Sequence, residues 1–254
     1  MFLVKSCQKK YNVDNCKTLR IGTLHEYRET ESQQIVDEQE GFLDIIVELN
    51  EKFIDIDLLN HLNNQHDSDF RAQLHNFIPG SKSGNYVRVT YSADYYWQNY
   101  NRFIFCISKL ERHEDSKSIF PDYDDYWYVS FFKKELFIKS IEEKLFEEVK
   151  NKLINGEQIF HKNIDDISML SIKSHYQEII YRDRGLYIDN DTIDGMHNEL
   201  IEIFENIKFI KPDTYKDEYE FRIVFDFYEK DKLLHPTIKS IIIPDSISHL
   251  IRQP

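Results

Sequence analysis

Three ionisable side chains alternate along a predicted strand near the C-terminal end. Glu218, Glu220 and Arg222 occupy every second position, with large apolar residues between and after them. Side chains two residues apart in a strand share one face, and two such carboxylates lie about 7 Å apart along the backbone. A pair of this kind can hold a sugar hydroxyl and stabilise positive charge that develops on a ribosyl carbon. The alternative is a solvated ladder of cross-strand ion pairs, because charged residues are mostly exposed.

A second candidate block lies near the N-terminus. Arg20, Gly22 and Thr23 form the end of a predicted strand, and Tyr27 and Arg28 follow. Glycine lets a backbone approach a ligand closely, and arginine offers forked donors for a phosphate group. The alternative interpretation is a charged surface loop.

The third candidate is an aromatic and acidic cluster at residues 123–128, which includes Trp127. Aromatic walls beside carboxylates suit a planar cationic or heteroaromatic ligand. Core packing next to a loop explains the cluster equally well. Ser108 and Ser130 have no histidine beside them in the sequence, so a hydrolase triad is unsupported.

Other chemistries have weak signals. His61, His66, Asp67 and Asp69 have loose spacing, without an H-E-x-x-H or EF-hand pattern, so no metal ligand is predicted. The sequence contains neither a P-loop nor G-x-G-x-x-G, which argues against a P-loop ATPase and a Rossmann enzyme. Three cysteines without C-x-x-C spacing favour neither a disulfide framework nor a zinc ribbon.

Composition limits the class of protein. The chain has 254 residues, 41% of them hydrophobic, and only 7 Gly and 6 Pro, so it has enough apolar residues for a substantial core. The net charge of −13 disfavours binding to duplex nucleic acid through the general field of the protein. No apolar run has the length of a membrane span, and the N-terminus lacks a signal-peptide pattern, so we expect a cytoplasmic protein without a membrane partner.

The hydrophobic pattern predicts an α+β fold with a mixed, mostly antiparallel sheet of about seven strands and flanking helices. We expect one domain over residues 1–254, with helical insertions near 51–80 and 134–160. Residues 78–85 have the composition of a loop, and 191 and 192 are candidate helix caps. The strands are expected at 19–24, 42–49, 86–91, 102–108, 126–132, 176–181, 218–227 and 238–243. The longer helices are expected at 134–154 and 193–208. We also expect short helices within 55–76 and the start of a helix after Pro244.

These motifs, in this order, resemble the bacterial domain-of-unknown-function 2971 family. The resemblance spans residues 19–250 and rests on short motifs: the block around Arg20, the strand that ends at Ser108, the element around Trp127, Glu218 to Arg222, and the last strand at Ile241 to Ile243. Residues 29–40 replace the Asn-Asp-Pro-like turn of that family, so the chain would be a divergent member.

More distantly, the layout is similar to that of ADP-ribosyltransferases, although the central Ser-Thr-Ser element is missing. The resemblance implies that Arg20, Gly22 and Thr23 contact NAD and that Tyr27 or Trp127 stacks on nicotinamide. It implies further that Glu220 orients the ribose and that Glu218 activates the acceptor. Arg222 would complete the NAD site.

The leading hypothesis is therefore a cytoplasmic bacterial effector or toxin, with a role in phage defence, that transfers ADP-ribose from NAD. Its acceptor would be a protein or nucleic acid, and an antitoxin is a candidate partner. The alternatives are a non-catalytic module that binds a ligand or protein, and a metal-dependent nuclease. The first hypothesis predicts that Glu220 and Arg20 face the same cavity.

Overall fold

The computed structural model describes residues 1–29 and 37–254, so much of the 29–40 segment compared above lies outside the described residues. The chain divides into two compact units, whereas the sequence predicts one domain. Unit 1 contains residues 1–40, 101–179 and 214–254, and unit 2 contains 41–100 and 180–213. Each unit has a hydrophobic core of its own.

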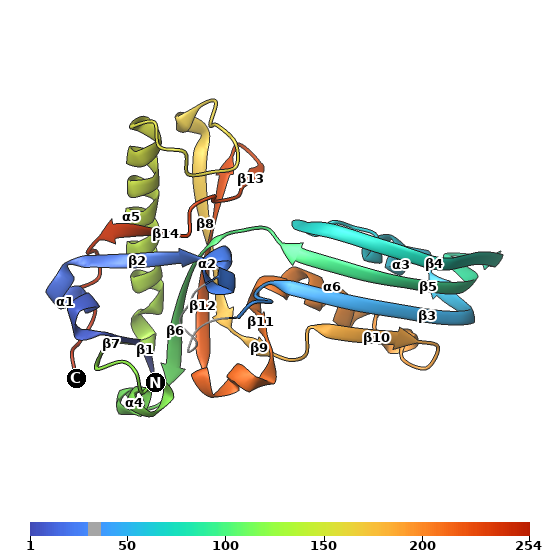
Figure 1. The fold of residues 1–254 in the computed structure, drawn as a ribbon, viewed down its shortest axis with the longest axis horizontal. Helices are drawn as coiled ribbons and strands as arrows, with labels where there is room; N and C mark the ends of the chain where they lie inside the picture. The colour runs from blue at the N-terminus through green and yellow to red at the C-terminus, as the bar shows by residue number, and fades with distance from the viewer. Residues whose placement is uncertain (30–36) are drawn as a thin grey trace. The chain divides into compact units, whose positions relative to one another are not determined.

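Unit 1 is built on an eight-stranded sheet in which every pair of neighbours is antiparallel (Figure 1). The predicted α+β class, with a mostly antiparallel sheet, is confirmed. Its strands are β1 (Phe2–Cys7), β2 (Thr18–Thr23), β6 (Phe103–Leu110), β7 (Asp125–Ser130), β8 (Leu170–Glu178), β12 (Glu220–Glu229), β13 (Lys232–Leu234) and β14 (Ser240–Pro244). Its helices are α1 (Val13–Cys16), α2 (Leu24–Glu29), α4 (Ser116–Ile119) and α5 (Lys134–Ile154).

One face of the central strands β6 and β12 is apolar. Phe105 lies opposite Ile223, and Ile107 lies opposite Phe221, so their side chains share a face. This face packs in one core with the buried side of α5, whose apolar residues recur every four positions. The predicted helix at 134–154 is confirmed at both ends.

The opposite face of β12 carries Glu220 and Arg222, and both are buried. Glu218 does not share this face, so the prediction of three alternating ionisable residues is wrong at its first position. Glu218 ends a 3-10 helix (Asp213–Glu218), and Tyr219 has a φ of 48°. That left-handed residue breaks the alternation, and the strand begins at Glu220.

β1 and β2 pair with the same edge of β6 but at different places along it. Val4 lies opposite Ser108, whereas Gly22 lies opposite Ile104. Neither strand pairs with the stretch of β6 between these positions, so the two strands separate there. The short helix α1 lies in the connection between them at the left of Figure 1.

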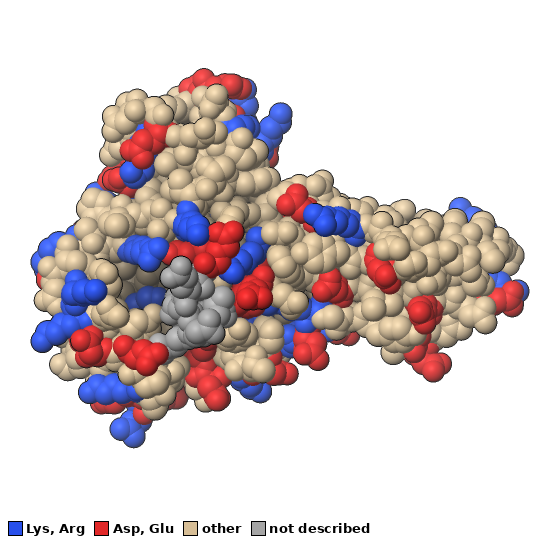
Figure 2. Space-filling view, viewed as in Figure 1, with Lys and Arg blue, Asp and Glu red and all other residues tan. Residues whose placement is uncertain are grey.

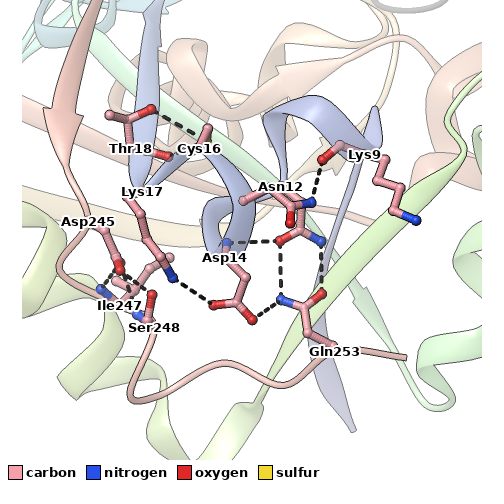
Figure 3. Close-up of polar contacts among 11 residues, drawn as sticks. Lys9, Asn12, Asp14, Cys16, Lys17, Thr18, Asp245, Ile247, Ser248 and Gln253 are labelled. Atoms are coloured by element: carbon pink, nitrogen blue, oxygen red, sulfur yellow. Dashed lines mark hydrogen bonds and ion pairs between the residues drawn. The ribbon is translucent and has the colours of Figure 1, made fainter.

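The C-terminal segment supports α1 (Figure 3). Asn12 is 1% exposed, and its amide donates to Gln253 Oε1 (2.8 Å) and Asp125 Oδ2 (2.9 Å). Gln253 Nε2 donates in return to Asn12 Oδ1 (3.1 Å) and Asp14 Oδ2 (2.8 Å). The two amides satisfy each other, which fixes α1 against the end of the chain.

Unit 2 contains a four-stranded sheet in the order β10-β3-β5-β4, with core residues from the helices packed on it. The predicted strand at 42–49 is confirmed and extends further. The other elements are a two-stranded parallel pair, two α-helices and short 3-10 turns. The strands are β3 (Phe42–Asp55), β4 (Ser68–Ser83), β5 (Tyr86–Asn99), β10 (Gly185–Asp189), β9 (Ile180–Tyr181) and β11 (Ile210–Lys211), and the helices are α3 (Ile56–Leu62) and α6 (His197–Asn206).

The prediction of a helical segment followed by a loop is wrong over most of residues 51–85. Only α3 is an α-helix there, and β4 continues through Pro79 and Gly80 to Ser83. Both residues are tolerated because β4 is an edge strand, and its pairing with β5 shifts register between Pro79 and Lys82. Pairing with β5 therefore overrides the local loop composition.

Two other helix boundaries differ from the prediction. The helix expected at 193–208 has its α-helical part at α6, and no side-chain cap is formed by its N-cap residue Met196. Thr192 and Asp191 precede a separate 3-10 turn instead. No helix follows Pro244; Asp245 accepts hydrogen bonds from the backbone of Ile247 and Ser248 in a turn.

We expect unit 2 to lose stability in mild acid. Burial lowers the pKa of His66, whose ring stacks on Phe204 at 4.1 Å, and burial together with nearby His197 lowers the pKa of His61. An unperturbed histidine has a pKa of about 6.5. As the pH drops through that value, these two histidines take up protons in the unfolded chain before they do in the folded one. The free energy of unfolding therefore falls until the pH reaches the lower pKa of the folded state. Thermal unfolding between pH 5 and 8 measures this fall. The variant His66→Gln should show a shallower dependence; an equally steep one would contradict the assignment.

Candidate ligand-binding pocket

A pocket of about 550 Å³ opens in unit 1 where β1 and β2 separate. Figure 2 shows a hollow on one face of unit 1, with both basic and acidic side chains near it. The volume lies within the range of small-molecule sites. Residues of β1, α1, β2, α2, β6 and β7 all line the pocket, so the divergence of the two strands creates it.

Four of the eight residues selected from the sequence line this pocket: Arg20, Gly22, Tyr27 and Trp127. Thr23 is fully buried beside them, and its hydroxyl donates to the backbone oxygen of Lys239 at 2.9 Å. The other three do not line it. They are Glu218, Glu220 and Arg222.

Arg20 forms an ion pair with Glu26, which also lines the pocket. The Nε of Arg20 donates to Ser240 Oγ at 3.1 Å, so the guanidinium is held from two sides. The Arg20 side chain is 62% exposed and that of Glu26 only 18%. Burial raises the pKa of Glu26, and the charge of Arg20 opposes that rise.

Lys5 supplies a second positive charge to the pocket. Its ammonium donates to the backbone oxygen of Cys106 at 2.8 Å, in the stretch of β6 that neither β1 nor β2 pairs with. It also lies 5.2 Å from the centroid of the Phe105 ring. Among the described residues no carboxylate forms an ion pair with Lys5. Two of its three N–H donors have no described acceptor and are available to an anionic ligand, which would share the charge of Lys5 with the nearby carboxylate of Glu26.

Aromatic rings form much of the wall. Trp127 is 1% exposed and lies parallel to Phe105 at 6.4 Å between centroids, so it belongs to the core as well as to the pocket. Tyr11 and Tyr123 line the more exposed part. Planar ligands pack well against such surfaces.

Glu220 does not line the pocket and belongs to a buried ion cluster. Arg222 binds both carboxylate oxygens of Glu40 (2.7 and 2.9 Å), and its Nε donates to Glu220 Oε1 at 2.7 Å. The three side chains are 0–6% exposed. Burial alone would lower the pKa of Arg222, but the carboxylates of Glu220 and Glu40 outweigh it, so the pKa lies well above its ordinary value.

Tyr27 lines the pocket and also interacts with Glu220 of this cluster. Burial raises the pKa of Tyr27 well above its ordinary value, and Cys106 and Glu220 raise it further. Its ring lines the pocket while its hydroxyl interacts with Cys106. Glu220 therefore interacts with a residue of the pocket, but it does not line the pocket beside Arg20.

Two cysteine thiols line the pocket, and neither has the environment of a nucleophile. Burial raises the pKa of Cys7 to about 12, and Asp125 adds to that rise. Cys16 donates to the backbone oxygen of Thr18 at 3.3 Å. A neutral thiol is a poor nucleophile, so covalent chemistry at Cys7 is not supported.

Sequence patterns did not identify Lys5, Glu26 or Glu40. Glu26 stands six residues after Arg20, so their pairing depends on the turn from β2 into α2. Lys5 follows three apolar residues in β1 and precedes Ser6, a pattern that gives no sign of a binding residue. Glu40 lies in a polar segment and pairs with a residue 182 positions away, for which the local sequence has no signal.

Gly22 allows α2 to lie close to β2. A Cβ at this position would lie 2.6 Å from Glu26 Oε2 and 3.2 Å from a ring carbon of Tyr27. We expect Gly22→Ala to displace these side chains and lower the free energy of unfolding by about 1–3 kcal/mol. Gly185→Ala, where a Cβ would have no neighbour within 4 Å, is the matched control. Urea unfolding measures the free energy of unfolding of both variants. Equal values would contradict the prediction and show that α2 can move to accommodate the added methyl group.

In the part of the chain that the structure describes, no three His, Cys, Asp or Glu residues are grouped as a metal site. No helix among the same residues combines the length and apolar character of a membrane span.

Comparison with known proteins adds no family to this description. No family model matches the chain, and no curated protein or solved structure is significantly similar to it. The fold and the pocket define an α+β protein with a pocket at a split in an antiparallel sheet. The resemblances described from the sequence stay predictions.

Proposed function

We propose that unit 1 binds a nucleotide in the pocket between β1 and β2, with NAD as the first ligand to test. The observation that carries the proposal is the ammonium of Lys5, a pocket residue that forms no ion pair with a carboxylate among the described residues. Arg20 supplies a guanidinium, and aromatic rings line the wall. An anionic pyrophosphate joined to planar bases has the chemistry that complements these groups.

Isothermal titration with NAD, ADP-ribose and AMP tests this proposal. We expect Lys5→Met to weaken binding about tenfold, because a charge-assisted hydrogen bond is lost. Lys150→Met removes the same charge from an exposed position in α5 and is the control. The proposal fails if none of the three nucleotides binds, or if the two variants lose affinity equally.

A catalytic role requires a carboxylate beside the ribose of NAD. Glu26 lines the pocket, so we propose Glu26 rather than Glu220 for that role. In the hydrolytic reaction the bond between C1′ and the nicotinamide nitrogen breaks, and neutral nicotinamide leaves with the bonding electrons. Water attacks C1′ and releases a proton, and the carboxylate stabilises the cationic transition state. Transfer to a protein or nucleic-acid acceptor would replace water by an acceptor nucleophile.

Nicotinamide release from NAD, followed by chromatography, tests the catalytic proposal separately from binding. We expect Glu26→Gln to reduce the rate at least a hundredfold while NAD still binds. If the wild-type protein binds NAD and releases no nicotinamide in the presence of water or added acceptors, catalysis is excluded and binding stands. Such a result would also remove the support for an NAD-consuming toxin in phage defence.

The second candidate function is a non-catalytic module that binds another protein, and unit 2 provides the observation that favours it. The edge strand β4 is exposed along most of its length, and its apolar residues Leu74, Phe77 and Ile78 are 47–59% exposed. An exposed strand edge with apolar side chains is a template for pairing with another chain. Sedimentation velocity over a range of concentrations tests the simplest case, self-association. Leu74→Lys should then abolish any dimer.

A further inference from the structure

We propose that a second pocket in unit 1 binds an organic cation that carries an ammonium or guanidinium group. This pocket has a volume of about 290 Å³ and adjoins the first, since Ser6 and Tyr123 line both. Cation binding at the second pocket does not require a nucleotide in the first.

Two neighbouring carboxylates give the second pocket its charge. Asp124 and Asp125 line it, and neither forms an ion pair with a lysine or arginine in the described part of the chain. The hydrogen bonds of Asp124 and Asp125 to the protein are to neutral donors. Asp124 Oδ1 accepts from the backbone N–H of Lys9 at 2.7 Å, and Asp125 accepts from the Asn12 amide at 2.9 Å. These bonds orient the carboxylates and leave their charges unneutralised.

A buried hydroxyl is an independent sign of a missing partner. Ser116 lines the same pocket, and the residue is only 1% exposed. Among the described residues its Oγ has no hydrogen-bond partner. A buried polar group without a partner destabilises the fold, and a ligand N–H that donates to Oγ would remove that cost.

The walls of the pocket suit a cation more than a neutral polar group. Phe120, Tyr123 and Tyr126 line it. Lys117 also lines it, and its ammonium lies 5.8 Å from the centroid of the Tyr126 ring. The protein therefore already places one cation on this aromatic face, at a distance where the attraction is significant. Lys117 has no ion-pair partner among the described residues, so an external cation competes with it for the pocket.

Agmatine, which carries both an ammonium and a guanidinium group, is the probe for this pocket. We expect binding by isothermal titration, with a roughly fivefold loss of affinity in Asp124→Asn. Asparagine can still accept the hydrogen bond from Lys9, so the loop should keep its structure. Lys117→Gln removes the competing ammonium and should raise affinity by a similar factor. Asp122→Asn, an exposed residue outside the pocket, removes the same charge as Asp124→Asn and is the control.

A short peptide with one arginine distinguishes a protein side chain from a free amine as the natural source of the cation. Tighter binding of the peptide indicates the former, and tighter binding of agmatine the latter. The proposal is overturned if neither probe binds, if Asp122→Asn weakens binding as much as Asp124→Asn does, or if Lys117→Gln lowers affinity. Failure of NAD to bind the first pocket would leave these results unchanged.

Discussion

Replacement of Arg222 by methionine is expected to lower the free energy of unfolding by about 3–5 kcal/mol. The change leaves the carboxylates of Glu40 and Glu220 buried without their cation, and both residues are at most 5% exposed. Methionine fills part of the volume but donates no hydrogen bond. Equilibrium unfolding in urea, followed by circular dichroism, measures the loss.

The control is Arg112→Met, in which an arginine with a 73% exposed side chain is removed from the same unit. That change should cost less than about 1 kcal/mol, because exposed ion pairs contribute little. A triple variant in which Arg222, Glu40 and Glu220 are all methionine tests the cause. If unpaired charge is responsible, the triple variant should be more stable than Arg222→Met alone. A triple variant that is less stable would indicate that the polar cluster itself holds unit 1 together.

The cluster also shows how far the sequence could predict the candidate site. The alternation of Glu220 and Arg222 correctly places both on one strand face, because side-chain direction in a strand is a local property. Whether that face meets water or protein depends on Glu40, which is 182 positions from Arg222. Glu218 does not share this face because Tyr219 has a left-handed backbone conformation, which interrupts the alternation of side chains. A tyrosine gives no sign in the sequence that its backbone will adopt that conformation.

The pocket, too, is formed partly by residues that are close in sequence and partly by residues that only the fold brings together. Arg20, Gly22 and Tyr27 are close in sequence, and the turn from β2 into α2 brings them together. Lys5 and Trp127 join them because β1 and β7 are paired, with Lys5 opposite Trp127. The pocket itself exists because β1 and β2 leave β6 at different points, which is a matter of strand register. Register is set by the packing of the whole sheet and is not contained in any one motif.

Trp127 is a core residue as well as a pocket residue, so its substitution should have a large effect on stability. We expect Trp127→Ala to lower the free energy of unfolding by about 3–5 kcal/mol, through lost burial and a cavity. The indole is packed against Phe105 and lies 5.9 Å from the Phe137 ring of α5. Tyr11→Ala removes a pocket aromatic that is 62% exposed and should cost less than about 1 kcal/mol.

The conservative variant Trp127→Phe separates the two roles of this side chain. Phenylalanine keeps most of the packing, so the protein should remain folded and NAD binding can be measured. If nicotinamide or adenine stacks on the indole, affinity should fall by about three- to tenfold, the value of one aromatic contact. Unchanged affinity in a folded Trp127→Phe protein would mean that Trp127 only supports the pocket wall. The stacking partner of the ligand would then be sought among the more exposed rings, Tyr11, Tyr27 and Tyr123, by the same paired measurement of stability and binding.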